Sequence, residues 1–278
     1  LHQLYGHNQE LFLKLLAGTK IHVVINKADY PRANVIFVHG MGENIHRYDQ
    51  LTAQLLKRNF NVIRYDQPSH GQSDGNHGDI EDLNLFTAFS TTVINYVKER
   101  FFDLATFMMG HSMGGFATLM TITKYPGLVD GAIACSPFSL YHQEMLGPLP
   151  VEGDPHAPFS GIKVAGNGGV HRDSRLSIRN GKDHTNVQAT NGTINTTFEG
   201  ALFLRDHLQE ITDPLFLIHG VEDGLISYRD TMDVFNGVGT RDRELHIYPF
   251  LMHATLNDPS RNNDIVEEVD HWITRRLY

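Results

Sequence analysis

A glycine-flanked serine near the middle of the chain has the spacing of a nucleophile. Residues 105–115 are ATFMMGHSMGG, so Gly110, Ser112 and Gly114 form a G-x-S-x-G pattern between an apolar stretch and a helical one. On a sharp strand-to-helix turn, side chains two positions from the central residue would collide with the turn, and glycine removes that collision. The hydroxyl then stands at the positive end of a helix. The pattern predicts Ser112 as a nucleophile, and its neighbour His111 as a packing residue.

A carboxylate suited to orient a general base follows further along the chain. Where a serine occupies such a turn, the acid and then the histidine come after it, each on a loop beyond a strand. The apolar stretch 214–218 is followed by Glu222 and Asp223. We prefer Asp223 because the next residue, Gly224, suits a tight turn, and Glu222 is the alternative.

The candidate general base is His253, on a loop after the predicted strand 244–248. It would take the proton of Ser112 during attack and return it to the leaving alcohol, while Asp223 fixes its tautomer. Three other histidines are set aside, because one precedes the acid and the others lie within a strand and a helix: His219, His246 and His271.

An early strand ends in a turn that suits an oxyanion hole. The segment 34–43 is NVIFVHGMGE, and glycines on both sides of Met41 let its backbone approach a substrate. A tetrahedral intermediate needs two preorganised N–H donors. We expect them to be the amides of Met41 and of Met113, the residue after the nucleophile.

Candidate pocket residues flank these groups. His39 and Gly40 lie on the oxyanion turn, and Phe138, Tyr141 and Met145 belong to a later segment with scattered apolar residues. They would line an acyl pocket, or alternatively pack the following insertion onto the core.

Alternating short apolar and longer amphipathic segments must position these groups. Strands are predicted at 21–26, 34–38, 61–65, 105–109, 131–135, 214–218 and 244–248, and helices at 48–58, 83–99, 113–124, 198–208 and 264–276. Most strands are apolar on consecutive positions, as in strands covered on both faces. The alternation predicts an α/β fold with a mostly parallel sheet and helices on both faces.

One region interrupts this alternation. From Met145 to Thr197 the chain is rich in Gly, Asn, Pro, Asp and His, and 161–170 and 179–195 have the composition of loops. Long irregular segments in compact domains are often functional, which predicts a lid. We therefore expect a core formed by 1–140 and 211–278, with a cap or lid inserted at 141–210.

Composition excludes several classes. The chain has 278 residues and a net charge of −9, which argues against nucleic-acid binding, and it has no apolar run long enough to span a membrane. A lone cysteine, Cys135, excludes an intrachain disulfide and favours a reducing, cytoplasmic compartment. The chain begins with leucine, so removal of an N-terminal segment stays open. We expect no metal or cofactor, because four histidines of the insertion lack metal-ligand spacing: His142, His156, His171 and His184.

Three segments resemble the monoacylglycerol lipase and lysophospholipase branch of the α/β hydrolases, which is related to serine aminopeptidases. They are HGMGENIHRY at 39–48, YDQPSHGQSDG at 65–75 and GHSMGG at 110–115. The resemblance implies an eight-stranded α/β-hydrolase fold with a late cap, and metal-free hydrolysis of single-acyl glycerol or lysophospholipid esters. It places the triad on Ser112, Asp223 and His253, and the oxyanion donors on Met41 and Met113.

This chain departs from the family pattern in two places. The family usually has a histidine where Asn44 stands. Its cap is also helical and apolar enough to meet a lipid surface, whereas the insertion here is polar.

The function expected is therefore ester hydrolysis, with a small acyl ester as partner, either in solution or presented at a lipid surface. A short-chain carboxylesterase is one alternative. An aminopeptidase-type serine peptidase is another, and it would need a carboxylate to hold the substrate's amine. A receptor or scaffold is disfavoured because all catalytic residue types are present. Oligomeric state is left open.

Overall fold

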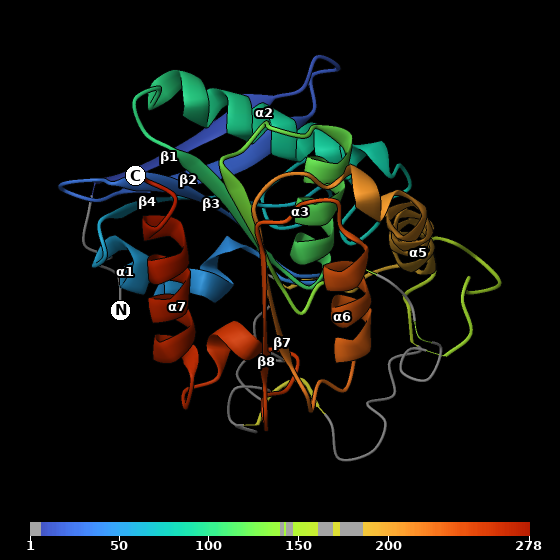
Figure 1. Cartoon of the computed structure of the whole chain (residues 1–278). Helices are drawn as coiled ribbons and strands as arrows, with labels where there is room; N and C mark the ends of the chain where they lie inside the picture. The colour runs from blue at the N-terminus through green and yellow to red at the C-terminus, as the bar shows by residue number, and fades with distance from the viewer. Residues whose placement is uncertain (1–6, 140–141, 143–146, 161–168, 173–185) are drawn as a thin grey trace.

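The computed structural model describes residues 7–139, 142, 147–160, 169–172 and 186–278. Its centre is an eight-stranded sheet with the order β1-β2-β4-β3-β5-β6-β7-β8 (Figure 1). The first three strands in that order pair antiparallel, and from β4 onward all neighbours are parallel. The strands are β1 (His7–Lys14), β2 (Lys20–Lys27), β3 (Ala33–Val38), β4 (Phe60–Tyr65), β5 (Thr106–His111), β6 (Gly131–Cys135), β7 (Leu215–Gly220) and β8 (Arg243–Tyr248).

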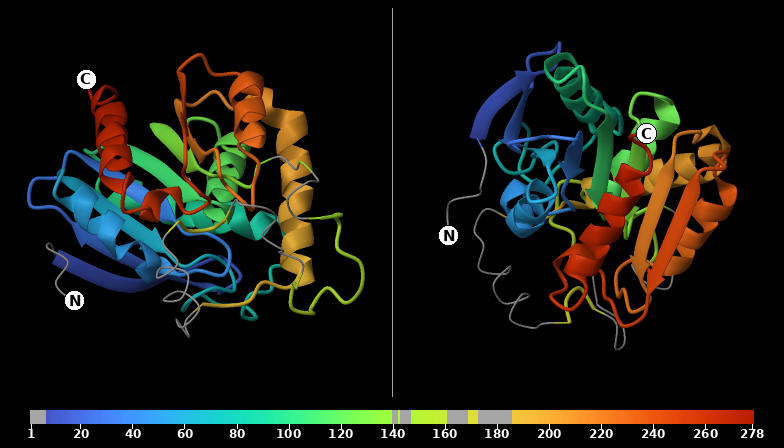
Figure 2. Two further views of the ribbon diagram at one scale, coloured as in Figure 1. Left: turned by 90° about the horizontal axis from the view of Figure 1, so that it is seen from below. Right: turned by 60° about the vertical axis from the view of Figure 1, so that its left-hand side comes forward.

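Helices cover both faces of the sheet (Figures 1 and 2). On one face lie α1 (Asp49–Leu56) and α7 (Asn262–Thr274), which contact each other. The other face carries α2 (Asn84–Arg100), α3 (Met113–Lys124), α5 (Asn191–His207) and α6 (Tyr228–Gly237). The described residues also form short 3-10 helices at η1 (Ile45–Tyr48), η2 (Leu208–Glu210) and η3 (Thr255–Asn257).

The central strands are buried along their whole length. Every residue of β3, β4, β5, β6 and β7 is buried. Two apolar clusters cause this, one between the sheet and α2, α3, α5 and α6, the other between the sheet and α1 and α7. Consecutive apolar residues in these strands therefore fill both clusters, as expected of parallel sheets.

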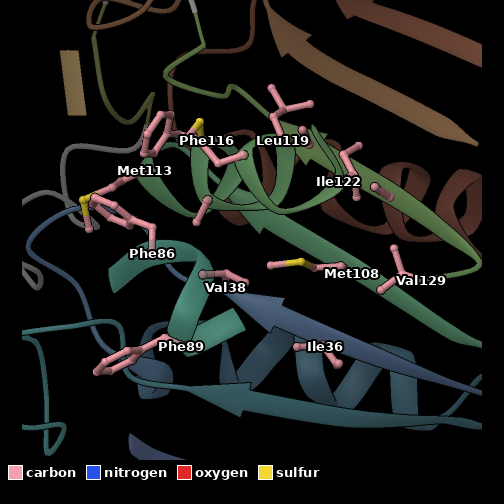
Figure 3. Packing of buried hydrophobic residues seen from close by; sticks show 14 of the residues in the cluster. Ile36, Val38, Phe86, Phe89, Met108, Met113, Phe116, Leu119, Ile122 and Val129 are labelled. Atoms are coloured by element: carbon pink, nitrogen blue, oxygen red, sulfur yellow. The ribbon is translucent and has the colours of Figure 1, made fainter. Parts of the chain in front are cut away.

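Helix α3 is the best anchored of the helices that bear on the site. All its residues from Met113 to Thr123 are buried. Figure 3 shows Phe116 of α3 beside Phe86 of α2, and their rings meet edge to face at 5.2 Å between centroids. The turn at Ser112 is thus followed by a helix that close packing holds along almost its whole length.

The predicted fold class is confirmed, with local differences at polar elements. Strand β1 and helix α6 were not expected, because β1 is a partly exposed edge strand and α6 has a mostly polar sequence. Helix α5 begins at Asn191 rather than Phe198, so 191–195 is helical and not loop. Its start is favoured by Thr190, whose side chain accepts a hydrogen bond from the backbone N–H of Thr193.

Within the described part of the chain, no helix combines the length and apolarity needed to cross a bilayer.

Candidate active site

Ser112 stands on a strained turn between β5 and α3. Its φ of +55° lies in the left-handed region, which a non-glycine residue rarely adopts. A Cβ at Gly110 would lie 2.1 Å from the carbonyl oxygen of Gly114, and one at Gly114 would lie 2.1 Å from that of Val38. Both glycines are therefore required sterically, as the motif predicts. The Ser112 amide donates to the carbonyl of Cys135 at 3.0 Å, which ties the turn to β6.

His253 and Asp223 lie in line with this serine. The distance from Oγ of Ser112 to Nε2 of His253 is 3.0 Å. On the other side of the ring, Nδ1 of His253 donates to Oδ2 of Asp223 at 2.7 Å. The three side chains come from the ends of β5, β7 and β8, so the sheet brings together residues separated by up to 141 positions. This is the arrangement in which an imidazole can remove a hydroxyl proton.

Four donors hold the carboxylate of Asp223. Oδ1 accepts the amides of Leu225 and Ile226 at 2.8 and 2.9 Å, and Oδ2 accepts both His253 and His219. Burial opposes ionisation, but the two histidines outweigh it and hold the pKa of Asp223 below its usual range. Conversely, burial lowers the pKa of His253, yet the charges of Asp223 and then Glu43 raise it above its ordinary value. The acid therefore stays ionised.

A short piece of the insertion braces the loops of both Asp223 and His253. The carbonyl of Gly169 accepts the amides of His253 and Gly224 at 3.1 and 3.2 Å. The carbonyl of Val170 accepts the amide of Ala254 at 2.9 Å. Because these bonds involve only backbone groups, no composition signal marks them in the sequence.

Two backbone amides near the serine are candidates for an oxyanion hole. Met41 and Met113 both line the cavity beside Ser112. On the first loop, the amide of Gly40 donates to Glu43 and the amide of Gly42 to His70, at 2.8 and 3.0 Å. Among the described residues, neither the amide of Met41 nor that of Met113 donates to another backbone group. They are therefore the amides available to a developing oxyanion.

Buried neutral histidines support the Met41 loop. Burial, and then the neighbouring His39, lower the pKa of His70 to about 4. The neutral ring donates from Nδ1 to the carbonyl of Pro68 at 2.8 Å, which leaves Nε2 to accept the Gly42 amide. His70 thus helps to position the Met41 loop. His39, expected in the pocket, lies behind its wall and accepts the amide of Gln67 at 3.0 Å.

His111 does more than pack. Its Nε2 donates to the carbonyl of His253 at 2.9 Å, and its Nδ1 lies 2.8 Å from the hydroxyl of Tyr48. The same hydroxyl lies 2.7 Å from Oε2 of Glu43, so its single proton serves one acceptor at a time. Burial, and then the neighbouring His253, lower the pKa of His111 to about 4. His111 thus fixes the backbone of the candidate base.

A cavity of about 300 Å³ opens beside the serine. Its described walls are mostly apolar, and they include the predicted Gly40 and Phe138. The predicted Tyr141 and Met145 lie outside the described residues. Apolar side chains that the sequence did not single out complete the wall: Phe159, Val170, Val187, Ala189, Ile194, Leu225 and Ile226.

The described histidines of the insertion tie it to the core. His142 pairs with Asp230, and His171 accepts from Arg47 at 2.9 Å. His156 donates to Asp79 at 2.8 Å and lies 3.3 Å from Glu81. The last three side chains come close enough to ligate a cation, although sequence spacing predicted no metal site. His156 and Glu81 are exposed, and the ion pairs account for the arrangement without a metal. His184 lies outside the described residues.

Comparison with known proteins places the chain in a family. Residues 29–260 match the model of the family described as serine aminopeptidase, S33. The chain is 26% identical to monoglyceride lipase of Rattus norvegicus over 89% of this chain and 84% of that one. It is 24% identical to monoacylglycerol lipase of Mycolicibacterium smegmatis, over 89% and 90%.

Solved structures agree on the fold. A soluble variant of monoglyceride lipase from Saccharomyces cerevisiae superimposes with a TM-score of 0.85 at 18% identity, covering 99% of this chain and 98% of that one. A carboxyl esterase from Bacillus coagulans gives a TM-score of 0.81 at 19% identity, covering 98% and 99%. The chain therefore belongs to the serine aminopeptidase S33 family, in the branch of the α/β hydrolases that contains the monoglyceride lipases.

Proposed function

We propose that the protein hydrolyses uncharged carboxylic esters of the monoacylglycerol type, with Ser112, His253 and Asp223 as its triad. The observation that carries this proposal is the line from Oγ of Ser112 through His253 to Asp223, with steps of 3.0 and 2.7 Å. The relatives support the reaction class, since their names include monoglyceride lipase, phospholipase and caffeoylshikimate esterase.

The geometry suits acyl transfer in two steps. Nε2 of His253 takes the proton as Oγ of Ser112 attacks the ester carbonyl carbon, and the amides of Met41 and Met113 stabilise the resulting oxyanion. Collapse of the tetrahedral intermediate breaks the bond to the alcohol, which leaves with the proton from His253. Water, deprotonated by the same imidazole, then hydrolyses the acyl-enzyme and frees the acid.

The cavity favours an uncharged substrate. Its described lining contains neither lysine nor arginine that would pair with a phosphate. Burying a charge without a partner is costly, so a lysophospholipid head group would gain little there. An acyl chain and a glycerol group match the mostly apolar wall better. We therefore favour a monoacylglycerol over a lysophospholipid.

An aminopeptidase needs a free carboxylate for the substrate's amine. Among the described lining residues the only carboxylate is that of Glu43. Its Oε2 accepts the amide of Gly40 and the hydroxyl of Tyr48, and Oε1 lies 3.5 Å from Nε of Arg47. Because these partners already engage Glu43, its carboxylate is not free to bind the amine of a peptide substrate. The site therefore suits an ester better than a peptide.

Covalent labelling tests the nucleophile. A fluorophosphonate probe should label the wild-type protein and fail to label Ser112→Ala, whereas Ser260→Ala, at an exposed serine, should be labelled normally. Labelling that persists in Ser112→Ala would refute the assignment.

Paired substrates test the specificity. A monoacylglycerol and a lysophosphatidylcholine with the same acyl chain should differ in kcat/KM, in favour of the monoacylglycerol. Equal or reversed rates would overturn the uncharged-ester proposal. Activity confined to short soluble esters would instead indicate a carboxylesterase, and cleavage of amino-terminal residues from peptides a peptidase.

A further inference from the structure

A second histidine lies on the far side of Asp223 from the general base. His219, near the end of β7, is fully buried, and its Nε2 lies 2.9 Å from Oδ2 of Asp223 and 3.2 Å from the carbonyl oxygen of Ile226. Both partners can only accept, so Nε2 carries a proton. On the other edge of the ring, Nδ1 lies 2.7 Å from the hydroxyl of Thr231. Both ring nitrogens are therefore partnered.

The partners of His219 make it a link between α6 and the acid. Thr231 belongs to α6 and is fully buried against β7. Oδ2 of Asp223 receives two imidazole N–H groups, one from His219 and one from His253. Of these two, only His253 faces the serine, and it must change protonation state during turnover. His219 is the fixed donor, and it keeps Oδ2 oriented whichever state the base is in.

The chemistry of His219 indicates a role beyond packing. A buried polar side chain is costly unless it is fully hydrogen-bonded, and an apolar residue would fill the same volume without that requirement. The hydrogen bond from His219 also offsets part of the negative charge of Asp223. Less of that charge then remains to stabilise a protonated His253.

We propose that His219 is a positioning residue of the triad, whose Nε2–H holds Oδ2 of Asp223 in line with Nδ1 of His253 and limits the basicity of that imidazole. This inference rests on the proposed function of Ser112, His253 and Asp223. Without the donor, the carboxylate would be less well aimed and turnover would fall. His253 would also become more basic, so the acid limb of the pH profile would move to higher pH.

Two amide substitutions separate the hydrogen bond from the shape of the side chain. Gln places its NH₂ near the position of Nε2 and can still reach Asp223, whereas the shorter Asn places its NH₂ near that of Nδ1 and cannot. His219→Gln and His219→Asn thus form a matched pair of uncharged polar residues. Thr231→Val provides a milder variant, since it removes only the hydroxyl that fixes the ring. All three leave unchanged the other described titratable groups that face His253, namely His111, Glu43 and His171.

The expected results concern kcat and the pH profile with a soluble ester. His219→Gln should stay within about 3-fold of wild-type kcat, with an unmoved acid limb. His219→Asn should lose about 10- to 100-fold in kcat at a similar KM, as expected for one hydrogen bond to a charged group, and its acid limb should move to higher pH. Thr231→Val should lower kcat and move the acid limb to higher pH as well, but each by a smaller amount.

Several outcomes would overturn the inference. Wild-type kcat and pH profile in His219→Asn would do so, and so would equal impairment of the Gln and Asn variants. If His219→Asn does not fold, Thr231→Val is decisive in its place. An unchanged kcat and an unchanged acid limb in Thr231→Val would then refute the inference. Each variant is first labelled with the fluorophosphonate probe beside wild type and Ser112→Ala. Absence of Ser112-dependent labelling in wild type refutes the proposed function itself, whereas normal wild-type labelling with insensitive His219 variants refutes only the role of His219.

Discussion

Asp223→Asn tests the triad most sharply, because the structure dictates how the new amide must lie. The amides of Leu225 and Ile226 both donate to Oδ1, at 2.8 and 2.9 Å. The asparagine oxygen will take that position, since it alone can accept. Its NH₂ then replaces Oδ2 and faces the N–H groups of His253 and His219. Donor meets donor at both rings.

The base relieves this clash by changing tautomer. His253 then carries its proton on Nε2, the atom that must accept the proton of Ser112 from 3.0 Å away. A wrong tautomer in a serine triad lowers kcat by about 10⁴-fold, which corresponds to about 5.5 kcal/mol in the activation free energy. KM should change little, because the carboxylate does not line the cavity.

The assay is the hydrolysis of a soluble p-nitrophenyl ester, with thermal denaturation to verify the fold. Glu222→Gln is the matched control, because it neutralises the adjacent carboxylate and should keep kcat within a few-fold. A folded Asp223→Asn that retains more than a tenth of wild-type kcat would refute the reasoning. An equally large loss in Glu222→Gln would transfer the role to Glu222.

Three further predictions follow from single contacts. The kcat/KM should rise with pH through a midpoint above 6.5, because the charge and hydrogen bond of Asp223, together with the charge of Glu43, outweigh burial and raise the pKa of His253, and only the neutral imidazole is a base; a pH–rate profile with a lower midpoint contradicts this. Gly110→Ala should lower the free energy of unfolding by about 3 kcal/mol or more, since its Cβ would lie 2.1 Å from the Gly114 carbonyl oxygen; a urea titration showing less than about 1 kcal/mol would count against it. Tyr48→Phe removes a buried hydroxyl that contacts two polar groups and should cost about 1–3 kcal/mol in the same titration, so an unchanged midpoint argues that the hydroxyl is dispensable.

The sequence predicts those parts of the site whose chemistry depends on local geometry. The turn at Ser112 is visible because two glycines are sterically required within five residues. The placement of Asp223 and His253 follows from strand order, since parallel strands present their carboxyl ends at one edge of the sheet. Strand β1 and helix α6 escape notice because both are short, with eight and ten residues, and mostly polar, so they contain too few apolar positions to establish a period.

Groups that act through tertiary contacts cannot be recognised in this way. With 17 histidines in the chain, nothing local distinguishes His219, His111 or His70 from the others. Their roles depend on contacts that form only in the folded chain, such as the one between His111 and the carbonyl of His253, 142 positions later. Each is buried and hydrogen-bonded through both ring nitrogens, a property that only the folded chain reveals.

The contacts of the polar insertion change what it implies about the substrate. Its composition suggested a poor match to a lipid substrate, yet its described pieces serve the site in two separate ways. Gly169 and Val170 brace the loops of Asp223 and His253 through backbone groups, for which side-chain polarity is irrelevant. Phe159 and Val187 supply apolar wall to the cavity beside Ser112. A segment can therefore be polar on average and still present an apolar surface where the acyl group would lie, so its mean composition is no argument against a monoacylglycerol.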